Sequence, residues 1–165
     1  MSDQGVEGGR QRAERFLQEA LREQTAGRYE AAAELYRRSL EAHPTAEAHT
    51  FLGWTYSFMG KLEEAIGECH RAIEIDPTFG NPYNDIGSYL MKQGKLNDAI
   101  VWLEKAKSAP RYEPRHYPYL NLARLYLAQG RFEEASREFS QAEFLHKELF
   151  HTDKPRSSDA GESVN

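Results

Sequence analysis

Gly60-Lys61-Leu62-Glu63-Glu64-Ala65 is one copy of a short pattern that decides how this chain folds. It recurs as Gly-Arg-Tyr-Glu-Ala-Ala at 27–32, Gly-Lys-Leu-Asn-Asp-Ala at 94–99 and Gly-Arg-Phe-Glu-Glu-Ala at 130–135. The four glycines are 33, 34 and 36 residues apart. A turn glycine, a large apolar residue two positions later and a small residue five positions later, repeated at this period, are typical of stacked helical hairpins.

Length and composition allow one compact domain or one short repeat array. The chain has 165 residues, 39% of them apolar, and a formal net charge of -5. This acidic balance argues against nucleic acid as a partner, because nonspecific binding to phosphates needs a basic face. No apolar run is long enough to insert in a bilayer, no secretory signal is evident, and Cys69 is the only cysteine. We therefore expect a soluble cytoplasmic protein and leave the nucleus open.

Apolar residues recur at helical spacing from Arg12 to Phe150, with interruptions at glycines and prolines. This pattern predicts an all-α fold of about eight helices, each three or four turns long. We expect a flexible arm over 1–9, a helical array over 10–151 and a disordered tail over 152–165. The expected repeats run over about 13–45, 46–79, 80–113 and 116–150.

Each hairpin is specified locally in the same way. The first helix should end at a glycine in the left-handed conformation, and the second should begin with acidic residues that favour the positive end of the helix dipole. Small residues are expected where the two backbones approach: Ala20, Gly53, Gly87 and Ala123 on the first helices, with Ala32, Ala65, Ala99 and Ala135 on the second. Larger side chains should complete the core: Leu52, Tyr56, Ile86, Leu90, Leu122, Tyr126, Tyr36, Cys69, Leu103 and Phe139.

These residues resemble a tetratricopeptide repeat (TPR) array from about Arg12 to Leu145. The second repeat fits best, through Leu52-Gly53, Tyr56, Gly60, Ala65, Ala72 and Pro77. It departs from the family pattern at His49 and Cys69, where an aromatic residue is more usual. The resemblance implies a right-handed superhelix of antiparallel helix pairs, whose first helices line a concave groove that binds peptides or partner helices. Members of the family are seldom enzymes.

The groove candidates follow from that resemblance. Phe51, Trp54 and Phe58 share one helical face and either anchor a partner or close the first repeat onto the second. Asn121 stands where some members bind a ligand backbone, unless it bonds locally within the groove. The partner-binding residues predicted for the groove are Phe51, Trp54, Phe58, Asn84, Asp85, Tyr117, Asn121 and Arg124.

Members that bind the acidic C-termini of heat-shock chaperones carry lysine and arginine in this groove. In this chain neither register of the repeats supplies these cations, so that specificity is not expected. The matching positions hold Leu17, Leu21, Phe51, Asn81 and Asp85 or, shifted by one repeat, Thr50, Trp54, Asp85, Tyr117 and Asn121. The loop 110–118 is rich in proline and explains the longer third spacing. Its cationic and aromatic side chains are either a solvated linker or a lip beside the groove.

Phe144, Leu149 and Phe150 extend the last helix and either cap the stack by folding back or support docking and self-association. No phosphate loop, dinucleotide motif, nucleophile elbow or metal-ligand spacing is present, so we expect no cofactor, no metal and no enzymatic activity. The leading hypothesis is a non-catalytic scaffold that binds a peptide or partner domain in its groove. The alternative is a small regulatory subunit or co-chaperone-like factor that docks through its convex face or C-terminal helix.

Overall fold

The computed structural model describes residues 3–151, with side chains described for residues 8–149. This part of the chain forms eight helices: α1 (Asp3–Thr25), α2 (Tyr29–Ala42), α3 (Ala46–Phe58), α4 (Leu62–Ile75), α5 (Asn81–Lys92), α6 (Leu96–Ser108), α7 (Tyr117–Ala128) and α8 (Phe132–His151). Between them, the described residues contain a single isolated bridge, Phe79 to Arg111, and no strand. None of these helices is both long and apolar enough to cross a membrane.

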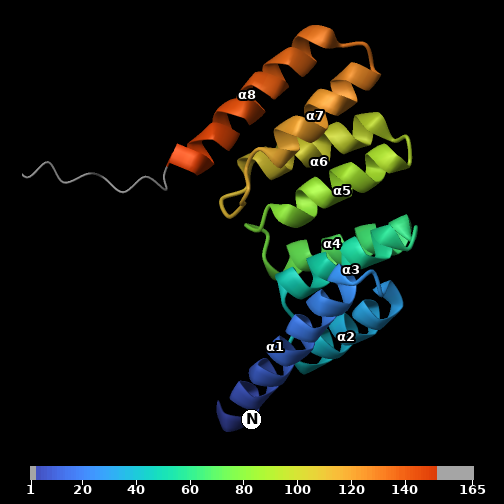
Figure 1. Cartoon of the computed structure of the whole chain (residues 1–165), viewed down its shortest axis with the longest axis vertical. Helices are drawn as coiled ribbons and strands as arrows, with labels where there is room; N and C mark the ends of the chain where they lie inside the picture. The colour runs from blue at the N-terminus through green and yellow to red at the C-terminus, as the bar shows by residue number, and fades with distance from the viewer. Residues whose placement is uncertain (1–2, 152–165) are drawn as a thin grey trace, which may run out of the picture.

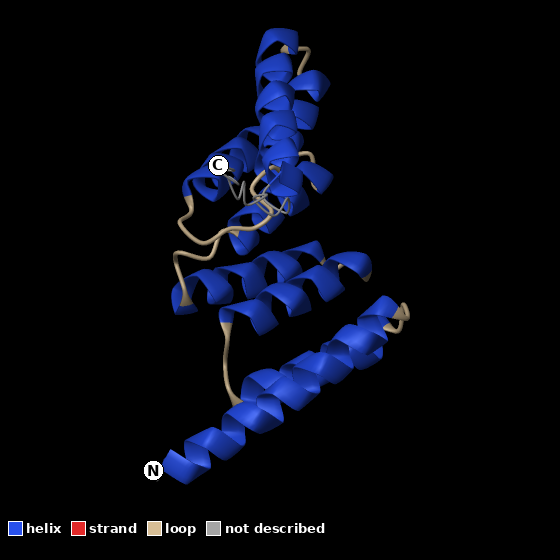
Figure 2. Ribbon diagram, turned by 60° about the vertical axis from the view of Figure 1, so that its left-hand side comes forward, coloured by secondary structure: helices blue, strands red, loops and turns tan. Residues whose placement is uncertain are grey.

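The helices pair in chain order into four antiparallel hairpins that stack along the long axis of the molecule (Figure 1). The hairpins change direction along the stack, and the loops between them lie on the side opposite the tight turns within them (Figure 2). The first helices of the hairpins, α1, α3, α5 and α7, are called the A helices below. This arrangement confirms the predicted all-α solenoid of eight helices.

The four turn glycines adopt the left-handed conformation that the sequence predicts. Their φ angles lie between 72° and 75°: Gly27, Gly60, Gly94 and Gly130. In the second hairpin the Lys61 amide donates to the Tyr56 carbonyl (2.9 Å) and the Gly60 amide to the Ser57 carbonyl (3.2 Å). The other three turns repeat this pair of hydrogen bonds, which is the Schellman motif and satisfies carbonyls at the end of the A helix.

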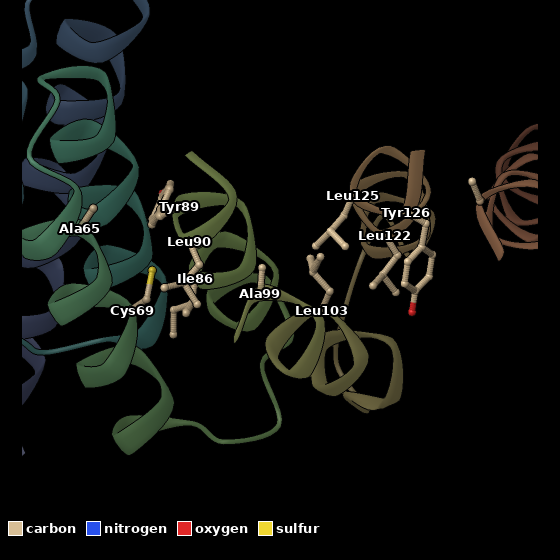
Figure 3. Close-up of a cluster of buried hydrophobic side chains, with 11 residues drawn as sticks. Ala65, Cys69, Ile86, Tyr89, Leu90, Ala99, Leu103, Leu122, Leu125 and Tyr126 are labelled. Atoms are coloured by element: carbon tan, nitrogen blue, oxygen red, sulfur yellow. The ribbon is translucent and has the colours of Figure 1, made fainter. Parts of the chain in front are cut away.

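Small residues allow the two helices of each hairpin to approach closely. All eight of the predicted small positions are buried. At Gly53 an added Cβ would lie 2.9 Å from the Ala65 carbonyl oxygen, and at Gly87 it would lie 2.6 Å from Leu103 Cγ. Larger side chains from α4 to α7 then meet in one continuous core, which links successive hairpins (Figure 3).

A buried polar contact occupies the second repeat where the sequence departs from its expected pattern. Glu68 on α4 is 8% exposed, and its carboxylate lies 2.6 Å from His49 Nδ1 on α3. The other carboxylate oxygen accepts from Arg71 at 2.5 Å. Cys69 is fully buried beside them, and burial raises the pKa of its thiol well above the usual range. A polar contact thus replaces the aromatic packing typical of the family at this hairpin.

The first helix begins earlier than the sequence suggested. We expected an irregular arm over 1–9, but α1 begins at Asp3. Helix extension adds one hydrogen bond for each residue fixed, so an established helix propagates readily into a polar flank. Gly9 also brings α1 close to the end of α2, because a Cβ there would lie 3.1 Å from the Ala42 carbonyl oxygen.

The last helix also differs from expectation. α8 continues unbroken to His151, so residues 144–150 do not fold back over the stack. Phe139, expected in the core, is 39% exposed, because the equivalent residues of earlier repeats are covered by the next A helix and no described helix follows α8. Phe144 is 57% exposed and Leu149 is 40% exposed. The Phe150 side chain and the tail over 152–165 lie outside the described residues.

Candidate functional site

Three A helices and one loop surround a cavity of about 400 Å³, which we call the groove pocket. Its lining residues are Thr50, Phe51 and Trp54 of α3, Asn81, Asn84 and Asp85 of α5, Tyr112 and Pro114 of the loop before α7, and Tyr117 of α7. Five of the eight residues predicted from the sequence are therefore gathered around one cavity.

Aromatic rings from α3 form one wall of the groove pocket. Phe51 stacks on Tyr36 of the first hairpin, with ring centroids 6.0 Å apart and planes 14° apart. It is therefore part of the junction between repeats as well as of the pocket wall. Trp54 is 45% exposed and contacts Phe58, whose ring stacks on Tyr29 at 5.0 Å. Phe51 and Trp54 thus line the same pocket, and Phe58 extends from Trp54 beyond it.

Amide side chains from α5 and α7 meet on the neighbouring surface. Asn121 Nδ2 donates to Asn84 Oδ1 at 2.9 Å, and Asn84 is 9% exposed. This contact is the local bond that the sequence left open for Asn121. The rest of its amide still offers an acceptor and a second donor hydrogen to a peptide backbone.

Asp85 contributes the only charged side chain among the lining residues. Asp85 as a whole residue is partly buried, and desolvation of its carboxyl group raises the pKa to about 7. A hydrogen bond from Asn84 and the charge of Lys92 partly oppose this rise. Asp85 makes no ion pair with any residue that the structure describes.

The loop between α6 and α7 is fastened to the loop between α4 and α5. The Gly80 amide donates to the Arg111 carbonyl (2.9 Å), and the Arg111 amide donates to the Thr78 carbonyl (3.0 Å). The Arg111 guanidinium pairs with Glu47 at 3.0 Å and with Asp76 at 2.6 Å. Hydrogen bonds from Thr78 and then from Arg111 lower the pKa of Asp76 to about 2. We call this set of contacts the Arg111 clasp.

The sequence left open whether this loop is a solvated linker or a lip beside the groove, and the structure places Tyr112 and Pro114 of the loop in the pocket wall. Tyr112 is 3% exposed and packs against Gly80, where an added Cβ would lie only 2.6 Å from Tyr112 Cβ. The useful signal was Gly80, a glycine before a helix that begins Asn81-Pro82. The prediction of a solvated cationic and aromatic patch is wrong for Tyr112 and for His116, which is 8% exposed. Burial, together with His146, lowers the pKa of His116.

Three of the predicted residues, Phe58, Asn121 and Arg124, do not line the groove pocket. Phe58 is 51% exposed and reaches the pocket through its contact with Trp54. Asn121 is joined to the pocket through Asn84, whereas Arg124 is exposed on α7 and does not line the cavity. Tyr117 does line it and is 48% exposed.

The chemistry on offer is that of a binding surface. Aromatic rings, amides and one carboxyl group line the groove pocket, which suits a peptide or a side chain of a partner. Within residues 3–151, no group of three or more histidine, cysteine, aspartate or glutamate residues is arranged to hold a metal ion.

Comparison with known proteins agrees with this architecture. Two family models, each described as a tetratricopeptide repeat, match residues 17–78 and 90–147, which together make up more than half of the chain. The chain is 28% identical over 95 residues to the small glutamine-rich tetratricopeptide repeat-containing protein 2 of Mycosarcoma maydis. That match covers 57% of this chain and 27% of the relative, so the chain spans about a quarter of the relative's length.

Two solved structures share the fold. One is described as the functional characterisation of Pseudomonas aeruginosa pilF, with a TM-score of 0.78 at 23% identity over 85% of this chain and 64% of that one. The other is the first TPR domain of Spaghetti (RPAP3) bound to the HSP90 peptide SRMEEVD, with a TM-score of 0.65 at 19% identity. It is matched over 95% of its length and 73% of this chain. The repeat matches and the eight-helix solenoid together place this chain in the tetratricopeptide repeat family.

Proposed function

We propose that this protein is a non-catalytic interaction module whose groove pocket binds a peptide or a short segment of a partner protein. The observation that carries this proposal is the convergence of α3, α5 and α7 on one cavity lined by aromatic and amide side chains. Rigid aromatic residues that are partly exposed in a cavity are the usual anchors of protein interfaces. The protein would thereby tether its partner or help to assemble a complex.

The amides support binding of an extended backbone. Asn84 and Asn121 lie side by side on adjacent A helices, and their free hydrogen-bonding groups suit a peptide main chain whatever its sequence. A domain of similar fold, cited above, is bound to a short peptide. That peptide is acidic, whereas no lysine or arginine lines the groove pocket of this chain, so a different peptide chemistry is expected here.

A selection with a random-peptide phage library against the full chain would test this function. Peptides that are enriched would be synthesised, labelled and measured by fluorescence anisotropy against the unchanged protein, Trp54→Ala and Asn121→Ala. We expect the dissociation constant to rise about tenfold or more for Trp54→Ala, as for other anchor residues. Circular dichroism should show unchanged helix content, because Trp54 is about half exposed and does not belong to the buried core.

Phe144→Ala is the matched control, because Phe144 is an aromatic residue on α8 that is 57% exposed, somewhat more than Trp54 at 45%. Its dissociation constant should equal that of the unchanged protein. Enriched peptides that lose affinity with Phe144→Ala but not with Trp54→Ala would contradict binding in the groove.

The same measurement addresses the alternative, docking through the C-terminal helix. That alternative is favoured by three exposed phenylalanines on α8: Phe132 at 70%, Phe139 at 39% and Phe144 at 57%. Self-association through Phe144, Leu149 and Phe150 would use the same helix. Sedimentation of the unchanged chain and of Phe144→Ala would test it, with a lower oligomer mass expected for the variant if α8 forms the contact.

A further inference from the structure

The groove pocket combines a carboxyl group with aromatic rings, and its described lining residues include no lysine or arginine. Trp54 and Tyr117 are about half exposed at the cavity, Phe51 and Tyr112 complete the aromatic part, and Asp85 lies among them. Among the described residues, Lys92 is the one cation that acts on Asp85, and its ammonium group lies 5.7 Å from the ring centroid of Tyr89. It does not line the pocket.

The two arginines next to the lining residues Tyr112 and Pro114 make contacts of their own. Arg111 forms the clasp with Glu47 and Asp76 and lies 4.3 Å from the Phe79 ring centroid. Arg115 donates to the Pro110 carbonyl at 2.8 Å. Among the residues that the structure describes, the Asp85 carboxylate therefore has no ion-pair partner.

We propose that the groove pocket accepts a long cationic side chain, lysine or arginine, from a basic segment of the partner protein. This inference rests on the proposed function and names the chemistry of the occupant. An ammonium or guanidinium group is attracted both to the faces of aromatic rings and to a partly desolvated carboxylate. The net charge of -5 would also favour encounter with a basic partner.

Other occupants fit these walls less well. An acidic side chain would meet Asp85 with no lining cation to offset the repulsion. An apolar side chain would cover the rings but would remove more water from the carboxyl group without giving it a partner. A cationic side chain satisfies both parts of the pocket.

Small-molecule probes can test the pocket directly in the full-length chain. Nα-acetyl-lysine methylamide, Nα-acetyl-arginine methylamide and the uncharged Nα-acetyl-norleucine methylamide would each be titrated at pH 8 and followed by ¹H–¹⁵N NMR. We expect saturable shifts of the side-chain amide signals of Asn84 and Asn121 with a cationic probe. Comparing the lysine and arginine probes shows which cation is preferred. Norleucine, which has a similar chain without the charge, should bind at least about tenfold more weakly.

Two variants and one control make the result specific. Asp85→Asn keeps the shape of the side chain and removes its charge. It should weaken binding of the preferred cationic probe about tenfold or more while leaving binding of the norleucine probe unchanged. Trp54→Ala should weaken binding of the cationic probe because it removes an aromatic ring from the pocket wall. Asp98→Asn removes an exposed acid from the start of α6, so it lowers the net negative charge equally but should leave binding unchanged.

The outcomes also separate this inference from the proposed function. Equal binding of norleucine, shifts confined to other surfaces, or cation binding that survives Asp85→Asn would overturn the cationic assignment. If the phage selection yields groove-binding peptides that lack lysine and arginine, the interaction module stands and the cationic assignment fails. If no peptide binds in the groove, both fail.

Discussion

Asp85 carries a carboxyl group in an environment that penalises its negative charge. It is half-buried between aromatic side chains, and desolvation moves its pKa to about 7. The neighbouring groups Cys69, Tyr89 and Tyr112 each have a raised pKa and stay uncharged up to pH 8. Lys92 is the charged neighbour that acts on the pKa of Asp85. A group of this kind reduces stability, and such a cost is commonly found at binding sites.

Asp85→Asn should therefore stabilise the free protein, and increasingly so as pH rises. The folded pKa lies above the unfolded value of 3.8, so between these values the folded state binds more protons and its stability falls with pH. At pH 8 the variant should gain about 1 to 3 kcal/mol, and near pH 4 the gain should nearly vanish. Urea denaturation at both pH values measures it. A constant difference between the two pH values would show that the carboxylate is not desolvated.

At the scale of single elements, the turn glycines and the helical glycines have opposite roles. Gly94 has a φ of 75°, where any side chain is strained, and nothing lies within 4 Å of its ideal Cβ position. Gly67 lies inside α4 with ordinary helical geometry and equally open space around its Cβ position. The two sites therefore differ in backbone conformation rather than in packing.

Alanine at these two positions should change stability with opposite signs. Gly94→Ala should lower the free energy of unfolding by about 1 to 2 kcal/mol because of left-handed strain. Gly67→Ala should raise it by up to about 1 kcal/mol because alanine favours the helix. Urea denaturation monitored by circular dichroism gives both values. A gain in stability at Gly94 would contradict the strained turn.

Helices, turns and hairpin cores could be predicted from the sequence because they depend on neighbouring residues. The glycine turns and buried alanines at Ala65 and Ala99 follow from the repeat alone. The position of Tyr112 could not be predicted, because its burial depends on Gly80, which is far away in the chain. The exposure of Phe139 depends on whether another helix packs against α8, and the local sequence pattern does not predict that packing.

The same distinction applies to the candidate site. Phe51, Trp54, Asn84, Asp85 and Tyr117 could be placed at one cavity because helical phase decides which residues face the groove. Arg124 could not be assigned in this way, because its distance from the pocket depends on how each hairpin is rotated relative to the preceding one. The contribution of the loop came from contacts between two linkers, which no periodicity describes.

At the scale of the whole molecule, the Arg111 clasp joins the second repeat to the linker before the fourth. Arg111→Ala removes both ion pairs, but these are about half exposed, so global stability should fall by about 1 kcal/mol or less. Protection of backbone amides from hydrogen exchange in the two joined loops should fall more than global stability. The Gly80 amide, which donates to the Arg111 carbonyl, should exchange its hydrogen faster.

Hydrogen exchange followed by NMR measures this effect at Gly80 and Tyr112. Arg137→Ala is the control, because Arg137 forms an exposed pair with Glu133 on α8 at 3.7 Å and leaves the linkers untouched. Exchange at Gly80 that is unchanged in Arg111→Ala would show that the backbone bonds hold the linkers without the guanidinium.

The clasp also bears on what binding costs. Because Tyr112 is held against Gly80 and Tyr83 by contacts within the chain, this side of the groove pocket is already shaped before a partner arrives. A partner would then lose its own conformational freedom with little matching loss from the receptor, which favours slow dissociation over adaptability. Removing the Arg111 ion pairs would let the loop move more, so the pocket would accept more varied partners but bind each of them more weakly.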